Sequence, residues 1–138
     1  MNVVILGCGR VGGLLARQLA QKGHRVSVID RNNSAFRRLQ GVGGLQLVEG
    51  TGIDTDVLRE AGITQADAFV ACTSGDNTNI TAAQVVREMF KVPQVIARIN
   101  DPIRESIFHE LGLETVSPTT RGASMVRDIL LGVRPQQP

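Results

Sequence analysis

Short apolar runs alternate with longer amphipathic segments along almost the whole chain. The apolar runs are rich in valine and isoleucine, which is typical of strands buried on both faces of a parallel sheet. They predict six strands: Val3–Leu6, Arg25–Asp30, Leu45–Val48, Asp67–Cys72, Gln94–Arg98 and Glu114–Val116. Because strands and helical segments alternate, the pattern predicts a doubly wound α/β fold.

Capping residues and glycines mark the helical segments between these strands. In the first segment, apolar residues recur at helical spacing (Val11, Leu14, Leu15 and Leu19), and Gly23 ends the helix. We expect the other helices at Asn33–Gln40, from Asp54 to Gly62, from Asp76 or Asn77 to about Phe90, from Asp101-Pro102 to Gly112 and from Ser117-Pro118 to about Leu131. In the last two, an N-cap residue is followed by proline at the first helical position.

The connections between these elements predict the topology. Right-handed crossovers and a glycine-rich first turn favour the strand order 3-2-1-4-5-6 of a Rossmann-type sheet. The elements fit a single domain over residues 1–132, with residues 133–138 as a tail or the start of a linker.

Composition narrows the classes of function. The net charge is only +2, no long basic run occurs and aromatic residues make up 3% of the chain, which argues against a nucleic-acid surface. No apolar stretch approaches the roughly 20 residues of a membrane helix, and the start lacks the basic region of a signal peptide. We therefore expect a cytoplasmic protein. Cys8 and Cys72 lack metal-ligand spacing and are expected to be reduced thiols.

The turn after the first strand carries the main chemical signal, the sequence Gly7-Cys8-Gly9-Arg10-Val11-Gly12. It follows a strand and opens a helix, which is the context in which GxGxxG binds a dinucleotide. Gly7 permits the tight turn, Gly9 lets the backbone approach a pyrophosphate, and Gly12 lets the helix lie close to the sheet. The helix N-terminus then offers unpaired N–H groups to phosphate. We expect an adenine nucleotide, ATP/ADP or NAD/NADH, to bind over this loop.

Two charged residues refine this expectation. Arg10 lies inside the loop, where its guanidinium can reach terminal phosphates; the alternative is a solvated arginine at a helix start. Asp30 ends the second strand, where a carboxylate accepts hydrogen bonds from the ribose hydroxyls and repels a 2′-phosphate; the alternative is a helix-capping aspartate. Arg31 weakens the exclusion of NADP a little.

Three further loops should meet at the same crevice, because ligands bind at the carboxyl ends of strands in such sheets. These are Gly50-Thr51, the turn that begins Thr73-Ser74, and Arg98 at the end of a strand. Gly50 and Thr73 are placed to pack on adenine and ribose, and Arg98 to face phosphates. The alternative for each polar residue is ordinary loop solvation or capping.

Catalytic constellations are not visible in the sequence. Neither a Ser/His/Asp nor a Cys/His arrangement occurs, and His24 and His109 are expected to be solvated. From its length we expect one domain, without a second one to hold a reducible substrate over a nicotinamide. We therefore expect a binding protein and no enzyme, with the cofactor domain of an NAD-dependent oxidoreductase as the alternative.

The set of motifs resembles a known family, the regulator of potassium conductance (RCK) domain. The resemblance rests on the glycine loop, Val28-Ile29-Asp30, Glu49-Gly50-Thr51, Thr73-Ser74-Gly75-Asp76-Asn77-x-Asn79 and Ala97-Arg98-Ile99-Asn100-Asp101. In particular the chain is similar, over about Met1 to Gly132, to the cytosolic nucleotide-binding subunits of Trk/Ktr-type potassium uptake systems.

The resemblance implies a regulator that senses ATP/ADP or NAD(H) and gates a potassium transporter or channel. It implies a homo-oligomer, a dimer that can extend to an octameric ring, held at the inner face of the membrane by a potassium-translocating subunit without inserting itself. By position, Asp30 would hold ribose, and Gly7, Gly9, Arg10 and Arg98 the phosphates. Thr73 and Asn79 would line the site less directly.

Two features of the C-terminal half bear on assembly. Met125, Val126, Ile129 and Leu130 form an apolar stripe that suits either a dimer interface or a core-facing helix. Some members of the family hold a divalent cation at the interface with a carboxylate after the last strand. The corresponding turn here, Ser117-Pro118-Thr119-Thr120, has no acid, so we predict no metal site.

Overall fold

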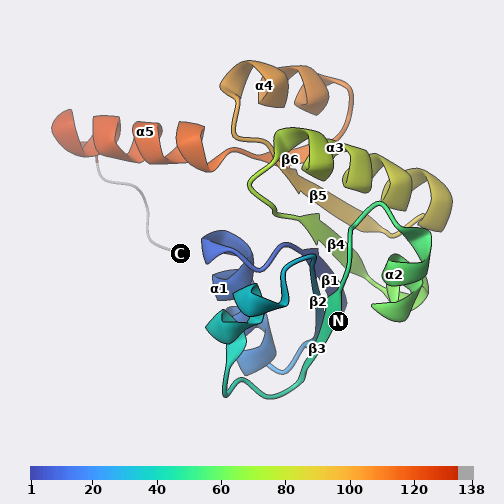
Figure 1. Cartoon of the computed structure of the whole chain (residues 1–138). Helices are drawn as coiled ribbons and strands as arrows, with labels where there is room; N and C mark the ends of the chain where they lie inside the picture. Colours follow the sequence, from blue (N-terminus) through green and yellow to red (C-terminus); the bar gives the residue numbers. More distant parts are fainter. Residues whose placement is uncertain (134–138) are drawn as a thin grey trace.

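The structure is a computed structural model and describes residues 1–133. It contains one six-stranded, all-parallel sheet in the order β3-β2-β1-β4-β5-β6 (Figure 1), which confirms the predicted fold class and strand order. The strands are β1 (Asn2–Leu6), β2 (Arg25–Asp30), β3 (Leu45–Glu49), β4 (Ala68–Ala71), β5 (Gln94–Arg98) and β6 (Glu114–Val116). Of the predicted tail at 133–138, residues 134–138 lie outside the described residues.

Helices connect successive strands, as the alternation predicted. The α-helices are α1 (Arg10–Gln21), α2 (Thr55–Glu60), α3 (Asp76–Val85), α4 (Pro102–Glu110) and α5 (Pro118–Leu130). The helix expected at Asn33–Gln40 is a 3-10 helix, η1 (Asn33–Leu39), and a second short one is η2 (Ile63–Gln65). The long helix expected to reach Phe90 is α3 continued by a π-helical segment, η3 (Val86–Phe90).

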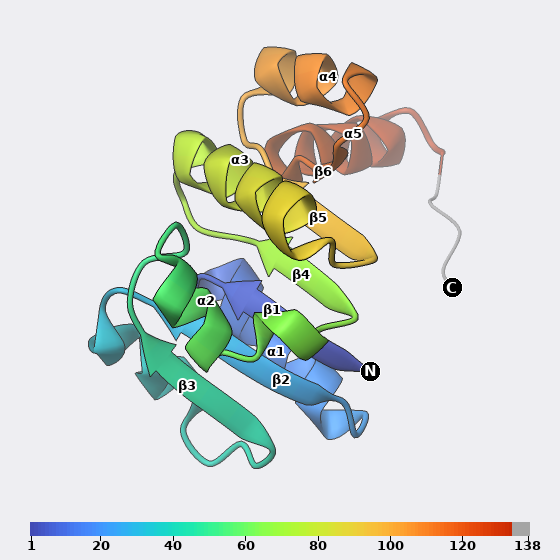
Figure 2. The ribbon, with the colours of Figure 1, turned by 90° about the vertical axis from the view of Figure 1, so that its right-hand side faces the viewer.

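The sheet separates two apolar layers (Figure 2). On one face, Val4, Leu6, Phe69 and Ala71 pack among residues of α2, η2 and α3. On the other face, neighbouring positions of the same strands pack against α1 and η1. Successive strand residues point to opposite faces, so both faces are apolar and both must be covered.

The first helix faces the sheet with only part of the apolar set that predicted it. Gly12, Gly13 and Ala16 are its fully buried residues, and Leu15 and Leu19 are partly buried against the same core. Val11 and Leu14 are exposed. The helical periodicity therefore located the helix correctly and placed two of its four apolar residues on the inner face.

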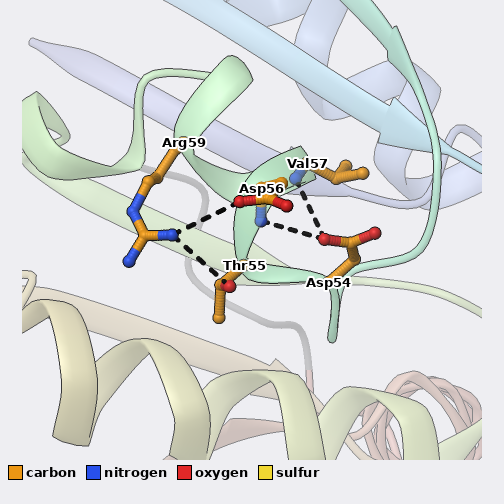
Figure 3. Close-up of polar contacts among 5 residues, drawn as sticks. All are labelled: Asp54, Thr55, Asp56, Val57 and Arg59. Carbon is orange, nitrogen blue, oxygen red and sulfur yellow. Dashed lines mark hydrogen bonds and ion pairs between the residues drawn. The ribbon is translucent and has the colours of Figure 1, made fainter.

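Capping residues start most of the other helices, as Asp54 illustrates for α2 (Figure 3). One carboxylate oxygen of Asp54 accepts hydrogen bonds from the N–H groups of Asp56 and Val57, at 2.9 and 3.4 Å. In the next turn, Arg59 lies 3.5 Å from both the Asp56 carboxylate and the Thr55 hydroxyl. These contacts fix the direction of α2, whose Val57 then packs over the β3–α2 loop.

The cap expected from Asp76 or Asn77 is wrong, because the N-cap of α3 is Gly75. Asp76 is the first residue of the helix, and its carboxylate accepts hydrogen bonds from the backbone N–H groups of Asn100 and Asp101. Asp76 thus contacts the loop between β5 and α4 and does not cap its own helix, and sequence spacing does not reveal such a long-range contact.

The last helix extends away from the rest of the domain (Figure 1). Among the described residues, none of α5 is buried. Its apolar stripe is more than half exposed at Met125, Val126, Ile129 and Leu130, so within one chain the stripe does not face a core. Within residues 1–133, none of the helices is both long and apolar enough to cross a membrane.

Candidate functional site

The glycine loop joins β1 to α1 at the carboxyl edge of the sheet. Two of its glycines are required by packing alone. A Cβ on Gly12 would lie 2.0 Å from the Gly7 carbonyl oxygen, and one on Gly7 would lie 2.7 Å from the Cys72 carbonyl oxygen. Gly7 also has a φ of 106°, which a side chain rarely adopts. The chain therefore needs these two glycines to fold.

Gly9 has no such reason within the protein. Its φ is −83°, which any residue adopts, and no atom of residues 1–133 would contact an added Cβ within 4 Å. The open space lies directly at the start of α1, because Gly9 is the N-cap of that helix. An atom that approaches the backbone closely at this point must come from outside the described chain.

The start of α1 also lacks the usual negative partner. Within residues 1–133, no side chain caps α1 and no acid occupies its first turn. Its first N–H groups have no carbonyl partner inside the helix, and the helix dipole makes this end positive. Arg10, exposed at the first helical position, adds a positive charge where a helix alone disfavours it. Together these groups make a cationic start that suits an anion.

Asp30 ends β2 beside this loop and already has two backbone partners. One carboxylate oxygen accepts from the Cys8 N–H at 2.8 Å and the other from the Asn32 N–H at 2.9 Å. A carboxylate offers about four acceptor positions, so two remain for further donors. Asp30 therefore ties β2 to the glycine loop and still presents acceptors, as a ribose-binding role requires. Arg31 is exposed next to it.

A surface hollow of about 460 Å³ lies beside Asp30. It is lined by Cys8, Gly9, Asp30, Asn32, Ser34, Ala35, Arg37 and Arg38. The first three of these residues are predicted from the sequence, whereas the others, which follow β2 within eight positions, are not. The signal was available, since the segment after an acid at the end of the second strand borders the ribose in a Rossmann-type site.

The β3–α2 loop approaches the site for a packing reason. A Cβ on Gly50 would lie 2.5 Å from a methyl group of Val57, so α2 requires a glycine there. The Gly50 N–H donates to the Asp30 carbonyl oxygen at 3.1 Å, which holds this loop against the end of β2. Thr51 beside it is exposed. The predicted contact of these residues with adenine and ribose stays a prediction.

Asn79 organises the turn after β4. Its side chain is fully buried, and its oxygen accepts from the Thr73 N–H at 2.9 Å and from the Thr73 hydroxyl at 2.7 Å. Its nitrogen donates to the carbonyl oxygens of Thr73 and Arg98, each at 2.9 Å. Asn79 thus joins the ends of β4 and β5 and is too buried to contact a ligand. Ser74 is exposed in the same turn.

Both thiols lie under the site, and both are free and buried. Burial raises the pKa of Cys8, the Asp30 charge raises it further, and the Arg38 charge opposes the rise. Burial likewise raises the pKa of Cys72, although the Arg98 guanidinium beside it acts in the opposite direction. Thiols with raised pKa values stay protonated at neutral pH and are poor nucleophiles.

Arg98, at the end of β5, is a further cationic residue at the carboxyl edge of the sheet. Its side chain is half-buried, with Nε donating to the Asn100 side-chain oxygen at 3.0 Å. The structure thus brings the glycine loop, Asp30, Gly50, Thr73 and Arg98 to one edge of the sheet. Asn79 lies beneath this edge, where its hydrogen bonds hold the turn after β4 to the end of β5.

Another hollow, of about 320 Å³, lies at the opposite edge of the sheet. Its lining includes Asn2, Arg25, Ser27 and Gln46 toward the amino ends of the first three strands, and Gln65 of η2. The N-terminal groups of α1 and the Asp30 carboxylate are at the other edge, where ligands of doubly wound sheets bind. We therefore place the candidate site at the carboxyl edge. Within residues 1–133, no cluster of three or more His, Cys, Asp or Glu residues could hold a metal ion.

The sheet order and the glycine loop define a Rossmann-like domain. A model of the TrkA-N domain family matches residues 3–118, and the chain belongs to this family.

Sequence relatives and a solved structure agree with that assignment. The Trk system potassium uptake protein TrkA of Streptomyces coelicolor is 56% identical over 117 residues, which are 85% of this chain and 52% of that protein. The TrkA homolog of Methanothermobacter thermautotrophicus is 34% identical over 131 residues, 94% of this chain and 60% of that protein. The GsuK channel bound to NAD superposes with a TM-score of 0.71 at 26% identity, over 87% of this chain and 22% of that one. The chain thus spans between half and two thirds of the length of these two relatives, and 22% of the TrkA protein of Vibrio alginolyticus.

Proposed function

We propose that this chain is a non-enzymatic domain that binds an adenine nucleotide, ATP/ADP or NAD/NADH, over the Gly7–Gly12 loop. We further propose that it regulates a potassium transporter or channel. The observation that carries the nucleotide site is the open space at Gly9, at the uncapped, cationic start of α1. A phosphate there would satisfy the helix N–H groups and neutralise Arg10, while Asp30 would accept the ribose hydroxyls.

The regulatory role is supported by the family and by its relatives. The curated relatives are named as potassium uptake proteins, and a structural neighbour is a channel bound to NAD. A nucleotide can shift such a protein only through different affinities for two conformations. In this proposal the chain works in the cytoplasm, peripheral to the membrane through a potassium-translocating partner.

Self-association is part of the same proposal. The apolar residues of α5 are exposed in the single chain, and so are Ile103 and Ile107 on α4 and Leu111 at its C-cap. Exposed apolar surface of this kind marks a site of association when its residues adjoin, as they do along one face of a helix. A second copy of the chain would bury the α5 stripe, which suits a dimer or a larger ring.

A calorimetric titration of ATP, ADP, NADH and NAD into the unmodified protein and into Gly9→Val tests the nucleotide site. Gly9→Val should keep the thermal unfolding temperature, because no protein atom lies near the added side chain. It should lower the affinity for every nucleotide, because the side chain fills the space assigned to phosphate. Gly43→Val is the matched control, since Gly43 is also uncontacted but lies before β3. Failure of all four nucleotides to bind the unmodified protein would refute the proposal, and so would equal binding by Gly9→Val.

A further inference from the structure

Arg98 is held by a neighbouring amide at the edge of the crevice. Its Nε donates to Asn100 Oδ1 at 3.0 Å, and both side chains are half-buried. The guanidinium also lies beside the thiol of Cys72, whose carbonyl group packs on Gly7. Arg98 is therefore separated from the glycine loop only by the end of β4.

Asn100 is itself fixed by the first turn of α3. Its Nδ2 donates to Asp76 Oδ1 at 3.1 Å and to the Ser74 carbonyl oxygen at 3.3 Å. Its backbone N–H donates to the same Asp76 oxygen at 2.7 Å. The amide cannot turn without breaking these bonds, so its oxygen is kept toward Arg98.

The chain of hydrogen bonds leaves Arg98 ready for an anion. Asp76 polarises the Asn100 amide, and hydrogen bonds in such a chain strengthen one another. With Nε engaged, the two terminal nitrogens of the guanidinium form the fork that matches two phosphate oxygens. Within residues 1–133, no carboxylate lies at ion-pair distance from Arg98. Its charge therefore has no compensating partner in the described chain.

We propose that Asn100, anchored by Asp76, is a positioning residue that aims the Arg98 guanidinium at the phosphate end of a bound nucleotide. The inference rests on the proposed nucleotide site and adds a residue that contacts no ligand. Fixing an arginine in advance removes part of the conformational entropy that binding would otherwise cost. Asn100 should therefore matter only while Arg98 is present and only for ligands that carry phosphate.

A double-mutant cycle on ATP and adenosine binding tests this. Arg98→Ala should weaken ATP about 10- to 150-fold, as expected for a charge-assisted contact. Asn100→Ala should lower the affinity for ATP about 3- to 10-fold and change the affinity for adenosine less than about twofold. In the Arg98→Ala background, adding Asn100→Ala should change ATP affinity less than about twofold, since residues in one network are not additive.

The control variant is Asn77→Ala, which removes an amide that accepts from Arg104 on the outside of α3 and α4. It should bind ATP like the unmodified protein. All titrations are run where circular dichroism shows each variant folded, and the ratio of ATP to adenosine affinity is the quantity compared. That ratio stays interpretable if a variant is less stable.

The two proposals fail differently in this experiment. If Asn100→Ala lowered the ATP affinity equally in the presence and absence of Arg98, Asn100 would be a structural residue only. The inference would be overturned, as it would if Asn100→Ala lowered the affinities for ATP and adenosine equally. If Arg98→Ala did not lower the ATP affinity, Arg98 would not contact the phosphates, and the inference would be overturned. Absence of ATP binding by the unmodified protein would refute the proposed function itself.

Discussion

Arg10 occupies a position that a helix by itself disfavours, at the positive end of α1 with no acid in the first turn. If it meets terminal phosphates, its contribution should grow with the charge at that end of the ligand. Arg10→Ala should then lower the affinity for ATP about 10- to 150-fold. It should lower the affinity for ADP less, and that for AMP or adenosine hardly at all. Calorimetric titration of the four ligands measures this.

Arg17→Ala is the matched control for this prediction. Arg17 lies on the same helix, but its guanidinium donates to the Arg38 carbonyl oxygen instead of facing the loop. It should leave the ATP-to-adenosine ratio unchanged. A uniform loss for all ligands in Arg10→Ala would mean that Arg10 only shapes the loop.

Asp30 should set the preference between nucleotides. Its carboxylate would accept ribose hydroxyls and repel a 2′-phosphate, so NADPH should bind at least about tenfold more weakly than NADH. Asp30→Ala should cost roughly 1.5–3 kcal/mol of NADH binding. Asp30→Asn, which keeps an acceptor for Cys8 or Asn32, should narrow the NADH-to-NADPH ratio, measured by competition titration. Equal affinities in the unmodified protein would contradict this role.

At the scale of elements, the start of α3 connects the crevice to α4. Asp76 accepts from the N–H groups of Asn100 and Asp101, and Asp101 is the N-cap of α4. Burial alone would raise the pKa of Asp76. The hydrogen bonds from Asn100 and Asp101 and the Arg104 charge outweigh it, so the pKa is lowered. The ionised carboxylate therefore stabilises the folded state.

The sign of this shift gives a pH prediction. A carboxylate whose pKa is depressed in the folded state stabilises it above the unfolded pKa and loses that effect as the pH falls through the folded pKa. Asp76→Asn should therefore unfold at lower denaturant concentration at pH 7, and the difference should shrink below about pH 4. Asp56→Asn, on an exposed carboxylate of α2, is the comparison. A difference that is constant with pH would exclude the charge as its cause.

At the scale of the whole molecule, the exposed stripe of α5 should decide the oligomeric state. Ile129→Asp and Leu130→Asp should convert an associated species into a monomer, because a charge would be buried in the interface. Thermal unfolding of the monomer should change little, since neither side chain packs inside the domain. Light scattering after size exclusion measures the mass.

Met89→Asp serves as the control for association. Met89 is 59% exposed, the same as Val126 on α5, but lies on η3. It should not change the mass. A monomeric unmodified protein at all tested concentrations would contradict the proposed interface.

The whole chain should also lack hydride-transfer activity. Within residues 1–133, burial raises the pKa of both thiols, so neither is an activated nucleophile at neutral pH. We expect no NADH oxidation with small carbonyl compounds at rates near one per second, an ordinary enzyme rate. Absorbance at the nicotinamide band follows the reaction. Steady turnover would favour the alternative, an oxidoreductase cofactor domain.

The sequence by itself determined the architecture. Apolar strands with helices between them require both faces of a parallel sheet to be covered, and right-handed crossovers with a glycine loop after the first strand favour the observed strand order. It also placed Gly7, Gly9 and Asp30 at one edge, because the carboxyl ends of parallel strands meet there. These are local signals, each readable within a few residues.

Only the tertiary structure decided which side chains serve which purpose. It showed that Gly50 is required by the packing of Val57, because a glycine's neighbours in space do not appear in its sequence. It showed that Asp76 does not cap its own helix but accepts a hydrogen bond from the N–H of Asn100, 24 residues away. It also left the α5 stripe exposed, since an apolar face has the same pattern whether it meets a core or another molecule.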